Sequence, residues 1–323
     1  MDHARICRQL IRALRGERSQ IQLSRWLGHK SNVLYTWEAG RRFPTGAELM
    51  QLAARVGVDV PAAWGRFYRS PPPWLATVDT TRPAGLARVL ADLRGGLSVQ
   101  ALADRAGLSR HAVSRALRAE AEPRGPELLA LIDGATLRGL DFIAALVDIE
   151  QVPEAAAPFR ALQQHRAAAA ARPWTQAVLR ALELAAYRDL PEHAEGWITQ
   201  RLGLPAGEES ESLRLLAAAG LARWDGRRWV GEDTAVDTRR DAATSAQLKG
   251  HWASVGQQRL GVGAPGLFSY NVFTVSDADL VRLEALHRQY FQQLRAIVSD
   301  SQPGERVVVA NVQLFALDAR AGG

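Results

Sequence analysis

Residues 19–44, Ser-Gln-Ile-Gln-Leu-Ser-Arg-Trp-Leu-Gly-His-Lys-Ser-Asn-Val-Leu-Tyr-Thr-Trp-Glu-Ala-Gly-Arg-Arg-Phe-Pro, decide the fold expected for the first part of this chain. The first residue suits a helix N-cap, and Leu23 and Leu27 lie one turn apart on one face of the helix that follows. Gly28 stands where the chain must turn sharply between two helices. A second helix is expected from Ser31 to Ala39. The stretch therefore predicts two short helices joined by a tight turn.

The spacing of residues in this stretch resembles that of the phage-repressor-like (XRE) helix-turn-helix family. That pattern places Leu three residues after a Ser-Gln pair and Gly nine after the Ser, followed by Trp-Glu-x-Gly-x-Arg-x-Pro. The matching positions, all in register, are Ser19, Gln20, Leu23, Gly28, Trp37, Glu38, Gly40, Arg42 and Pro44. The departure is Ser24, where the family usually has Ala, and a small side chain is kept there.

The resemblance implies that the helix at 31–39 enters the major groove of double-stranded DNA with its amino end first. Its exposed positions, expected to meet the bases, are Ser31, Asn32, Tyr35 and Thr36. Asn can pair with adenine, and hydroxyl groups can meet several base edges. Gln20 is implied to contact DNA, and the cations that suit the phosphates are Lys30, Arg41 and Arg42. Trp37 and Glu38 are expected to be structural.

Positive charge is concentrated near the amino terminus. The chain has a formal net charge of +6, and residues 1–70 contain 12 basic and 5 acidic residues. Residues 71–150 have a net charge of −1, and residues 151–323 are balanced. A basic segment on a neutral body suits a module that binds a polyanion. A solvated basic surface is the plainer interpretation.

A second copy of the same unit is expected after the proline-rich stretch 70–74. Ser98, Leu102 and Gly107 keep the spacing of the Ser, Leu and Gly in the first copy, but the Trp-Glu-x-Gly-x-Arg-x-Pro tail is missing. Its outward face carries a second candidate set of DNA contacts: Arg110, His111, Ser114, Arg115 and Arg118. A structural or dimerising repeat is an equally good interpretation.

The following half predicts a winged-helix-like module. Helices are expected over 194–202 and 208–219, and the Asp-Gly pair within 220–230 predicts a β-hairpin. Three carboxylates open the second helix, in Glu208-Glu209-Ser210-Glu211, and they would repel phosphates. This favours protein packing over DNA reading, although three hairpin cations argue the other way: Arg223, Arg227 and Arg228.

The last segment changes character. Residues 268–275 and 306–317 alternate like strands, and a helix is expected from 276 to 298. Two strands around one helix do not make an independent domain, so they pack on the winged helix or pair in a partner subunit. We favour the second solution and expect a dimer whose interface involves residues 262–318.

The order of parts from about residue 126 to 318 resembles a family of predicted bacterial transcriptional regulators whose carboxy-terminal domain is of unknown function. Residues 311–317 and the helix start at 276–280 carry this match. It implies a regulator and supplies no ligand or catalytic residue.

The expected fold class is mainly α, with two helix-turn-helix lobes, a winged-helix-like module and a small α+β element at the carboxy terminus. The expected domains are residues 1–69, the first helix-turn-helix; 83–150, the second lobe; 151–261, helical and winged-helix-like; and 262–323, strand-helix-strand.

The sequence lacks the residue patterns that are typical of metal sites, of common catalytic sites and of membrane spans. The seven histidines include no pair at helical metal-ligand spacing, and Cys7 is the single cysteine. No nucleophile elbow or phosphate-binding loop is present, so no catalytic residue, metal or cofactor is expected. No apolar run reaches the length of a membrane span, and residues 1–5 lead into an amphipathic run. A cytoplasmic protein is therefore expected.

The sequence as a whole predicts a sequence-specific DNA-binding transcription regulator, a homodimer whose carboxy-terminal half dimerises or senses a signal. The alternative is a protein-interaction module, antitoxin-like or a scaffold, whose helix-turn-helix units contact a protein. A third interpretation is an enzyme of unrecognised type in the carboxy-terminal half.

Overall fold

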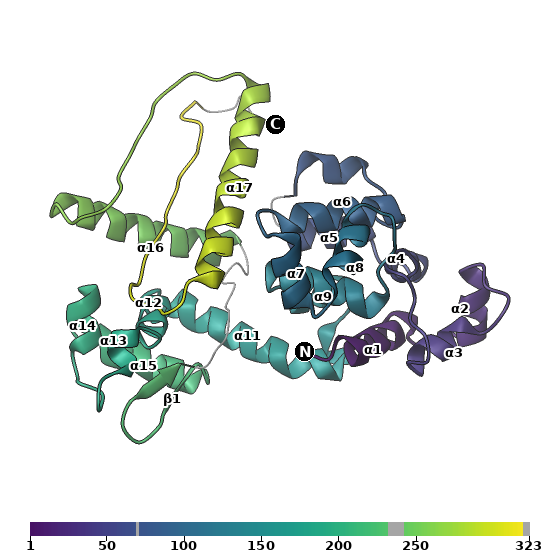
Figure 1. Cartoon of the computed structure of the whole chain (residues 1–323), viewed down its shortest axis with the longest axis horizontal. Coiled ribbons are helices and arrows are strands. Elements are labelled where there is room, and N and C mark those ends of the chain that lie inside the picture. Colours follow the sequence, from purple (N-terminus) through teal and green to yellow (C-terminus); the bar gives the residue numbers. More distant parts are fainter. Residues whose placement is uncertain (69–70, 232–241, 319–323) are drawn as a thin grey trace. The chain divides into compact units, whose positions relative to one another are not determined.

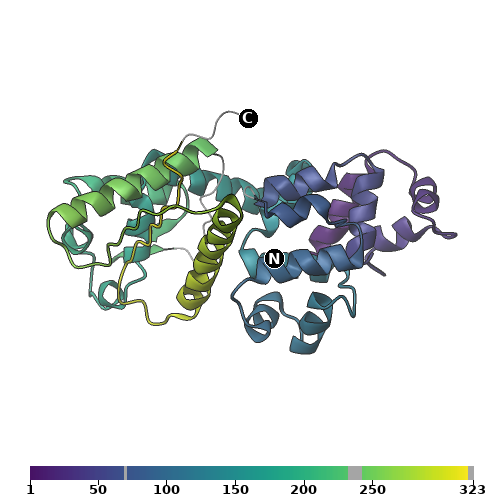
Figure 2. The same cartoon turned by 90° about the horizontal axis from the view of Figure 1, so that it is seen from above.

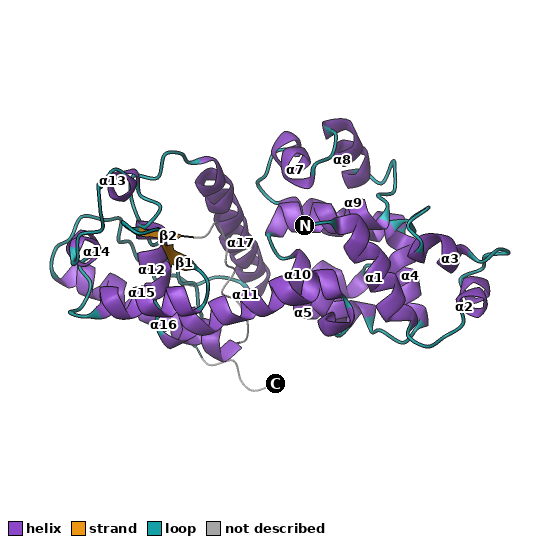
Figure 3. Cartoon of the chain, turned by 90° about the horizontal axis from the view of Figure 1, so that it is seen from below, coloured by secondary structure: helices purple, strands orange, loops and turns teal. Residues whose placement is uncertain are grey.

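The computed structural model describes residues 1–68, 71–231 and 242–318. Within them the chain is mainly helical and has one small antiparallel sheet of two strands (Figures 1 and 3). The backbone divides into two compact units, which we call the amino-terminal unit (1–160) and the carboxy-terminal unit (161–323). Among the helices of the described residues, none has the length and apolar character needed to cross a membrane.

Short helices make up the amino-terminal unit. They are α1 (His3–Arg15), α2 (Gln20–Trp26), α3 (Val33–Glu38), α4 (Gly46–Arg55), α5 (Val60–Tyr68), α6 (Pro83–Arg94), α7 (Val99–Ala106), α8 (Arg110–Leu117), α9 (Gly125–Thr136) and α10 (Gly139–Leu146), with 3-10 turns at Pro73–Thr77 and Ile149–Gln151. The helix expected over 31–39 is thus two residues shorter at its amino end and one shorter at its carboxy end.

One hydrophobic core runs through the whole amino-terminal unit. Helix α9 lies at its centre, where α1, α6, α7 and α10 pack against it. The same core contains Leu49 and Trp64 from the first predicted lobe and Leu102 and Ile132 from the second. The two lobes suggested by the sequence repeat therefore share their interior.

Two loops that are distant in sequence are joined beside this core. The Gly46 N–H donates to the Pro123 carbonyl at 2.8 Å, and the Gly125 N–H donates to the Pro44 carbonyl at 2.8 Å. A Cβ on Gly125 would lie 2.6 Å from the Cys7 sulfur, closer than real contacts allow. Glycine at this position lets the loop before α9 approach α1.

The proline-rich stretch after α5 is packed against the amino-terminal unit. Leu75 is buried, and the Arg88 guanidinium lies 4.6 Å from the centre of the Trp74 ring. Gly85, in α6, faces the Asp79 carbonyl so closely that a Cβ would lie 2.1 Å from its oxygen. Residues 71–85 therefore form part of the folded unit and do not act as a free connector.

The carboxy-terminal unit begins within α11 (Pro153–Ala171), which crosses the boundary between the units. It continues with α12 (Trp174–Ala181), α13 (Ala185–Arg188), α14 (Trp197–Leu202), α15 (Glu208–Ala218), β1 (Ala222–Trp224), β2 (Trp229–Gly231), α16 (Ala242–Gly261) and α17 (Asp277–Asp300). Helix α15 packs on α12, α14 and β1. The two helices predicted before the hairpin are confirmed in α14 and α15, within a few residues at their ends.

The predicted hairpin is also confirmed. Strands β1 and β2 pair antiparallel, with Ala222 opposite Gly231 and Trp224 opposite Trp229. The Asp225 carboxylate accepts hydrogen bonds at 2.9 Å from the Arg227 and Arg228 N–H groups, which closes the turn.

The strands predicted at 268–275 and 306–317 are wrong for the isolated chain. Both stretches are long loops that lead into and out of α17 (Figures 1 and 2), while the predicted helix between them is present. A strand needs a neighbour for its N–H and C=O groups. Among the described residues neither stretch pairs with another segment, so the N–H and C=O groups of these alternating stretches have no neighbouring strand to bond.

Candidate nucleic-acid interface

The turn between α2 and α3 is held from inside by Ser24. This side chain is fully buried, and its hydroxyl donates to the Gln20 carbonyl at 2.8 Å and accepts from the Leu34 N–H at 3.1 Å. Gly28 takes a positive φ of 84°, as the sharp turn requires. The serine that departs from the family pattern thus provides a hydrogen bond between the two helices, which an alanine could not.

A buried carboxylate joins α1, α2 and α3. The Glu38 side chain is only 6% exposed and accepts from Arg15 Nε at 2.6 Å and from Gln20 Nε2 at 2.8 Å. Arg12 adds a hydrogen bond to the Glu38 carbonyl at 3.2 Å. Glu38 therefore has the internal role expected of it. The amide nitrogen of Gln20, a predicted DNA contact, is used in this network.

Most of the remaining predicted contacts are exposed around α3. They are Lys30, Ser31, Tyr35, Arg41 and Arg42. The Tyr35 side chain is 48% exposed, and the Arg41 guanidinium lies over its ring at 5.5 Å. This stacking holds one cation beside the phenol and leaves the polar edges of both groups open to solvent.

Asn32 and Thr36 are half-buried and hydrogen-bonded within the protein. Asn32 is the N-cap of α3, and its Oδ1 accepts from the Tyr35 N–H at 3.2 Å. The Thr36 hydroxyl donates to the Val33 carbonyl at 2.7 Å. The cap uses the oxygen of the Asn32 amide, and its Nδ2 makes no hydrogen bond among the described residues. A base contact by Asn32 would have to come from that nitrogen.

The second candidate set surrounds α8. Arg110, His111, Arg115 and Arg118 are exposed, whereas Ser114 is half-buried. Arg118 forms an ion pair with Glu120 at 3.1 Å, which weakens the positive potential at the end of the helix. Figures 2 and 3 show α7 and α8 well apart from α2 and α3. The structure does not bring the two candidate sets together.

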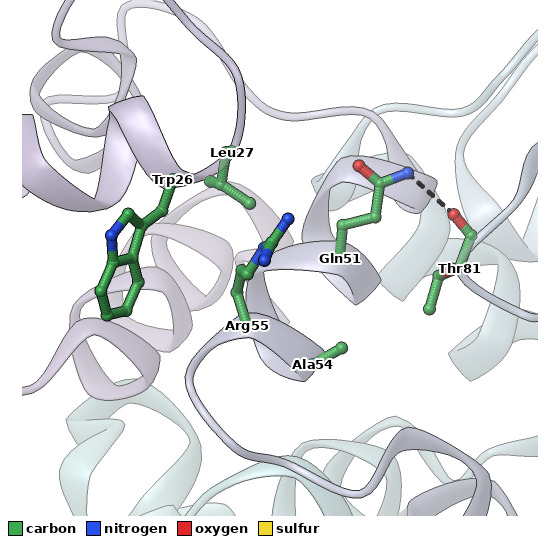
Figure 4. A pocket seen from close by; sticks show the side chains of 6 residues that line it. All are labelled: Trp26, Leu27, Gln51, Ala54, Arg55 and Thr81. Atoms are coloured by element: carbon green, nitrogen blue, oxygen red, sulfur yellow. Dashed lines mark hydrogen bonds between the residues drawn. The ribbon is translucent and has the colours of Figure 1, made fainter.

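An open hollow of about 350 Å³ lies beside α2 (Figure 4). Trp26, Leu27, Arg55 and Thr81 are among its lining residues, and the Gln51 amide donates to the Thr81 carbonyl at 3.0 Å. Only Arg55 brings a charge, so the hollow lacks the converging polar groups of a catalytic site. Throughout the described residues, no three His, Cys, Asp or Glu side chains come together in a way that could hold a metal ion.

The carboxylates that open α15 are held by other protein groups. Glu208 pairs with Arg172 at 2.8 Å, and Glu211 pairs with Arg214 at 2.8 Å. Glu209 is buried and accepts from the Thr199 N–H at 2.7 Å. These acids stabilise the packing of α14 and α15, which agrees with a structural use of this helix.

Sequence reasoning missed a group of side chains around Glu209. The second Glu209 oxygen lies 3.9 Å from His193 Nε2, and the Tyr187 hydroxyl lies 3.0 Å from His193 Nδ1. Burial raises the pKa of Tyr187, which keeps the phenol neutral. No sequence spacing signals this group, because its members come from three separate parts of the carboxy-terminal unit.

Comparison with known proteins covers the second half of the chain. Residues 154–317 match the family described as a domain of unknown function, DUF4423. This agrees with the resemblance noted in the sequence to a family whose carboxy-terminal domain has no known function. No curated protein and no solved structure matches the chain. Because the match covers half of the chain, this protein belongs to the DUF4423 family.

Proposed function

We propose that this chain is a transcription regulator that binds double-stranded DNA through a helix-turn-helix formed by α2 and α3. The observation that carries the proposal is the surface around α3, where Tyr35 on the helix and Lys30, Ser31 and Arg41 beside its two ends are exposed. The Glu38 hydrogen bonds hold this helix against α1 and α2. Exposed cations suit phosphates, and polar groups at the helix start suit base edges. The excess of positive charge in residues 1–70 supports the same function.

Helix α3 is held in place by hydrogen bonds from the rest of the amino-terminal unit. Base reading needs a helix whose side chains are held in register with the groove. Helix α3 has only six residues, and isolated helices of that length are unstable in water. The Ser24 hydrogen bonds and the Glu38 network supply the missing stability from within the amino-terminal unit.

The test starts with a random duplex library and the full-length protein at low salt. We expect the wild-type chain to enrich one motif. Asn32→Ser and Asn32→Ala both remove the Nδ2 donor, but Ser keeps a cap oxygen for the Tyr35 N–H. Both variants should therefore lose about 1–3 kcal/mol of discrimination at the same base position. Only Asn32→Ala should also lower stability, by about 1 kcal/mol.

Matched variants separate the two candidate surfaces. Arg41→Ala should weaken binding to the selected duplex, whereas Arg110→Ala should leave it nearly unchanged if α8 is not in contact with DNA. The reverse pattern would move the interface to α7 and α8. Failure to enrich any duplex would refute DNA binding altogether.

The alternative function is a protein-interaction module. It is favoured by the internal hydrogen bonds of Gln20, Asn32 and Thr36, since these reduce the number of groups available to bases. If the chain is a protein-interaction module, the wild-type protein should not bind duplex DNA even at low salt. If it is a DNA-binding protein, it should bind duplex DNA at low salt, and the affinity should fall as salt is added.

A further inference from the structure

The carboxy-terminal unit carries a large apolar surface that none of the residues described by the structure covers. We call residues 262–318 the arm; it consists of the two long loops and α17 (Figure 1). Eighteen of the twenty-five exposed large hydrophobic side chains of the described residues belong to it. The most open are Leu267 at 104%, Tyr270 at 89%, Val262 and Leu317 at 80%, and Val272 at 79%.

The apolar area that the arm exposes is comparable in size to that of a homodimer interface. If a large apolar side chain offers on the order of 200 Å² at full exposure, the eighteen of the arm together expose on the order of 2,000 Å². The largest apolar patch on a soluble monomer is about 300–600 Å². Obligate homodimers bury about 2,000 Å² or more, and their interfaces are strongly apolar.

The loop after α17 has the pattern of a strand. Every second side chain from 308 to 316 is apolar: Val308, Ala310, Val312, Leu314 and Ala316. The opposite face carries Asn311 and Gln313 between the apolar Val309, Phe315 and Leu317. An uncharged segment that is apolar on one face and largely apolar on the other is typical of a strand that is covered on both faces. Among residues 1–68, 71–231 and 242–318 no segment pairs with it, and it is a loop there.

The arm is fixed at its base. The Gly304 carbonyl accepts a hydrogen bond from the Ala185 N–H at 2.8 Å, and Val307 packs against the core of the carboxy-terminal unit. Helix α17 begins at a formed cap, where the Ser276 hydroxyl accepts from the Asp279 N–H at 3.1 Å. The apolar surface is therefore presented on an element that is anchored to the carboxy-terminal unit near residues 304–307.

We propose that the arm pairs with the same arm of a second copy of this chain about a two-fold axis. Residues 268–275 and 307–317 contain no charged side chain, so they offer no complementarity to a charged partner and meet no repulsion from an identical copy. A two-fold axis places each uncharged, alternating segment beside its equal and gives the strand its missing neighbour. This inference does not rest on DNA binding.

The first experiment is sedimentation of the full-length protein without DNA, from nanomolar to tens of micromolar concentration. We expect a species of twice the monomer mass of 35.3 kDa across most of this range. A monomer at every concentration would overturn the proposal. The apolar surface of the arm would then be a binding surface for a different protein.

The second experiment compares two neighbouring substitutions that add the same charge. Val312→Glu places a carboxylate on the apolar face and should raise the dimer dissociation constant by about a hundredfold or more, since a buried unpaired charge is costly. Gln313→Glu places it on the opposite face, at a position that is already polar, and should change this constant by less than about threefold. Equal effects of both, or no effect of Val312→Glu, would contradict the proposed pairing.

Loss of folding can be told apart from loss of pairing. Val312 is 45% exposed in the isolated chain, so glutamate fits there without disturbing a core. The helical circular dichroism of Val312→Glu should therefore match the wild type. If it does not, Leu314→Glu tests the same face from the next position, and the mass of the wild-type chain decides the proposal independently.

Discussion

Removal of the Glu38 carboxylate should destabilise the amino-terminal unit measurably. Glu38→Ala breaks two hydrogen bonds from Arg15 and one from Gln20. Hydrogen bonds to charged groups contribute about 1.5–3 kcal/mol each, and breaking a buried ion pair costs about 3–5 kcal/mol. The side chains of Arg15 and Arg12 are 23% and 60% exposed, so both cations can turn to water. We therefore expect a loss at the lower end, about 2–3 kcal/mol.

The single cysteine provides the assay. Cys7 lies in the core of the amino-terminal unit, and burial raises the pKa of its thiol to about 12. The native thiol should be inert to a thiol reagent at mildly alkaline pH and should react once this unit unfolds. The fraction of Cys7 that is labelled, measured against urea concentration, reports the free energy of unfolding of this unit alone.

Two further variants make the measurement specific. Glu17→Ala removes an exposed carboxylate at the end of α1 and should change the free energy of unfolding by less than about 0.5 kcal/mol. In a double-mutant cycle with Arg15→Ala, the coupling to Glu38 should be about 1–2 kcal/mol. A Glu38→Ala protein as stable as the wild type, or a coupling of zero, would refute the role given to this network.

Three other outcomes are expected. Gly85→Ala should cost about 3 kcal/mol in the same labelling assay, because its Cβ would meet the Asp79 carbonyl oxygen at 2.1 Å, whereas Gly65→Ala, with open space around it in α5, should stabilise by about 0.5–1 kcal/mol. Burial lowers the pKa of His165 below its ordinary value, so stability is present above about pH 6.5 and falls as the pH drops below it. His165→Gln should flatten this dependence of the melting temperature, and an unchanged slope would contradict it. Arg41→Ala should weaken binding to all duplexes alike and lower the slope of log affinity against log salt by roughly one unit; a loss at one base position only would instead make it a base contact.

The sequence predicted the helices well where local signals are strong. The serine before the second copy, Ser98, and the glycine turns at 28 and 107 act within a few residues, and the structure has helices beside each of them. The hairpin was predicted equally well, because its Asp-Gly turn signal lies within the hairpin itself.

Its errors had two sources, a local helix cap at Asn32 and partners that are distant in sequence. Asn32 looked like an exposed base reader, but a cap oxygen and a base-reading nitrogen belong to the same amide, and sequence alone does not say which is used. The alternation at 306–317 predicted a strand correctly as a pattern, but a strand forms only beside a neighbour. The shared core depends on how α9 packs, which no repeat in the sequence reveals.

The core that runs through α9 also sets the smallest piece of this protein able to fold. A fragment that stops at residue 69 would contain α1 to α5 but would leave the inner faces of Leu49 and Trp64 in water, because their neighbours come from residues beyond the cut. The loops joined at Pro44 and Gly125 would lose one side of their pairing. We therefore expect the amino-terminal unit to fold as one piece of about 160 residues, from which α1 to α5 cannot be separated as a stable fragment.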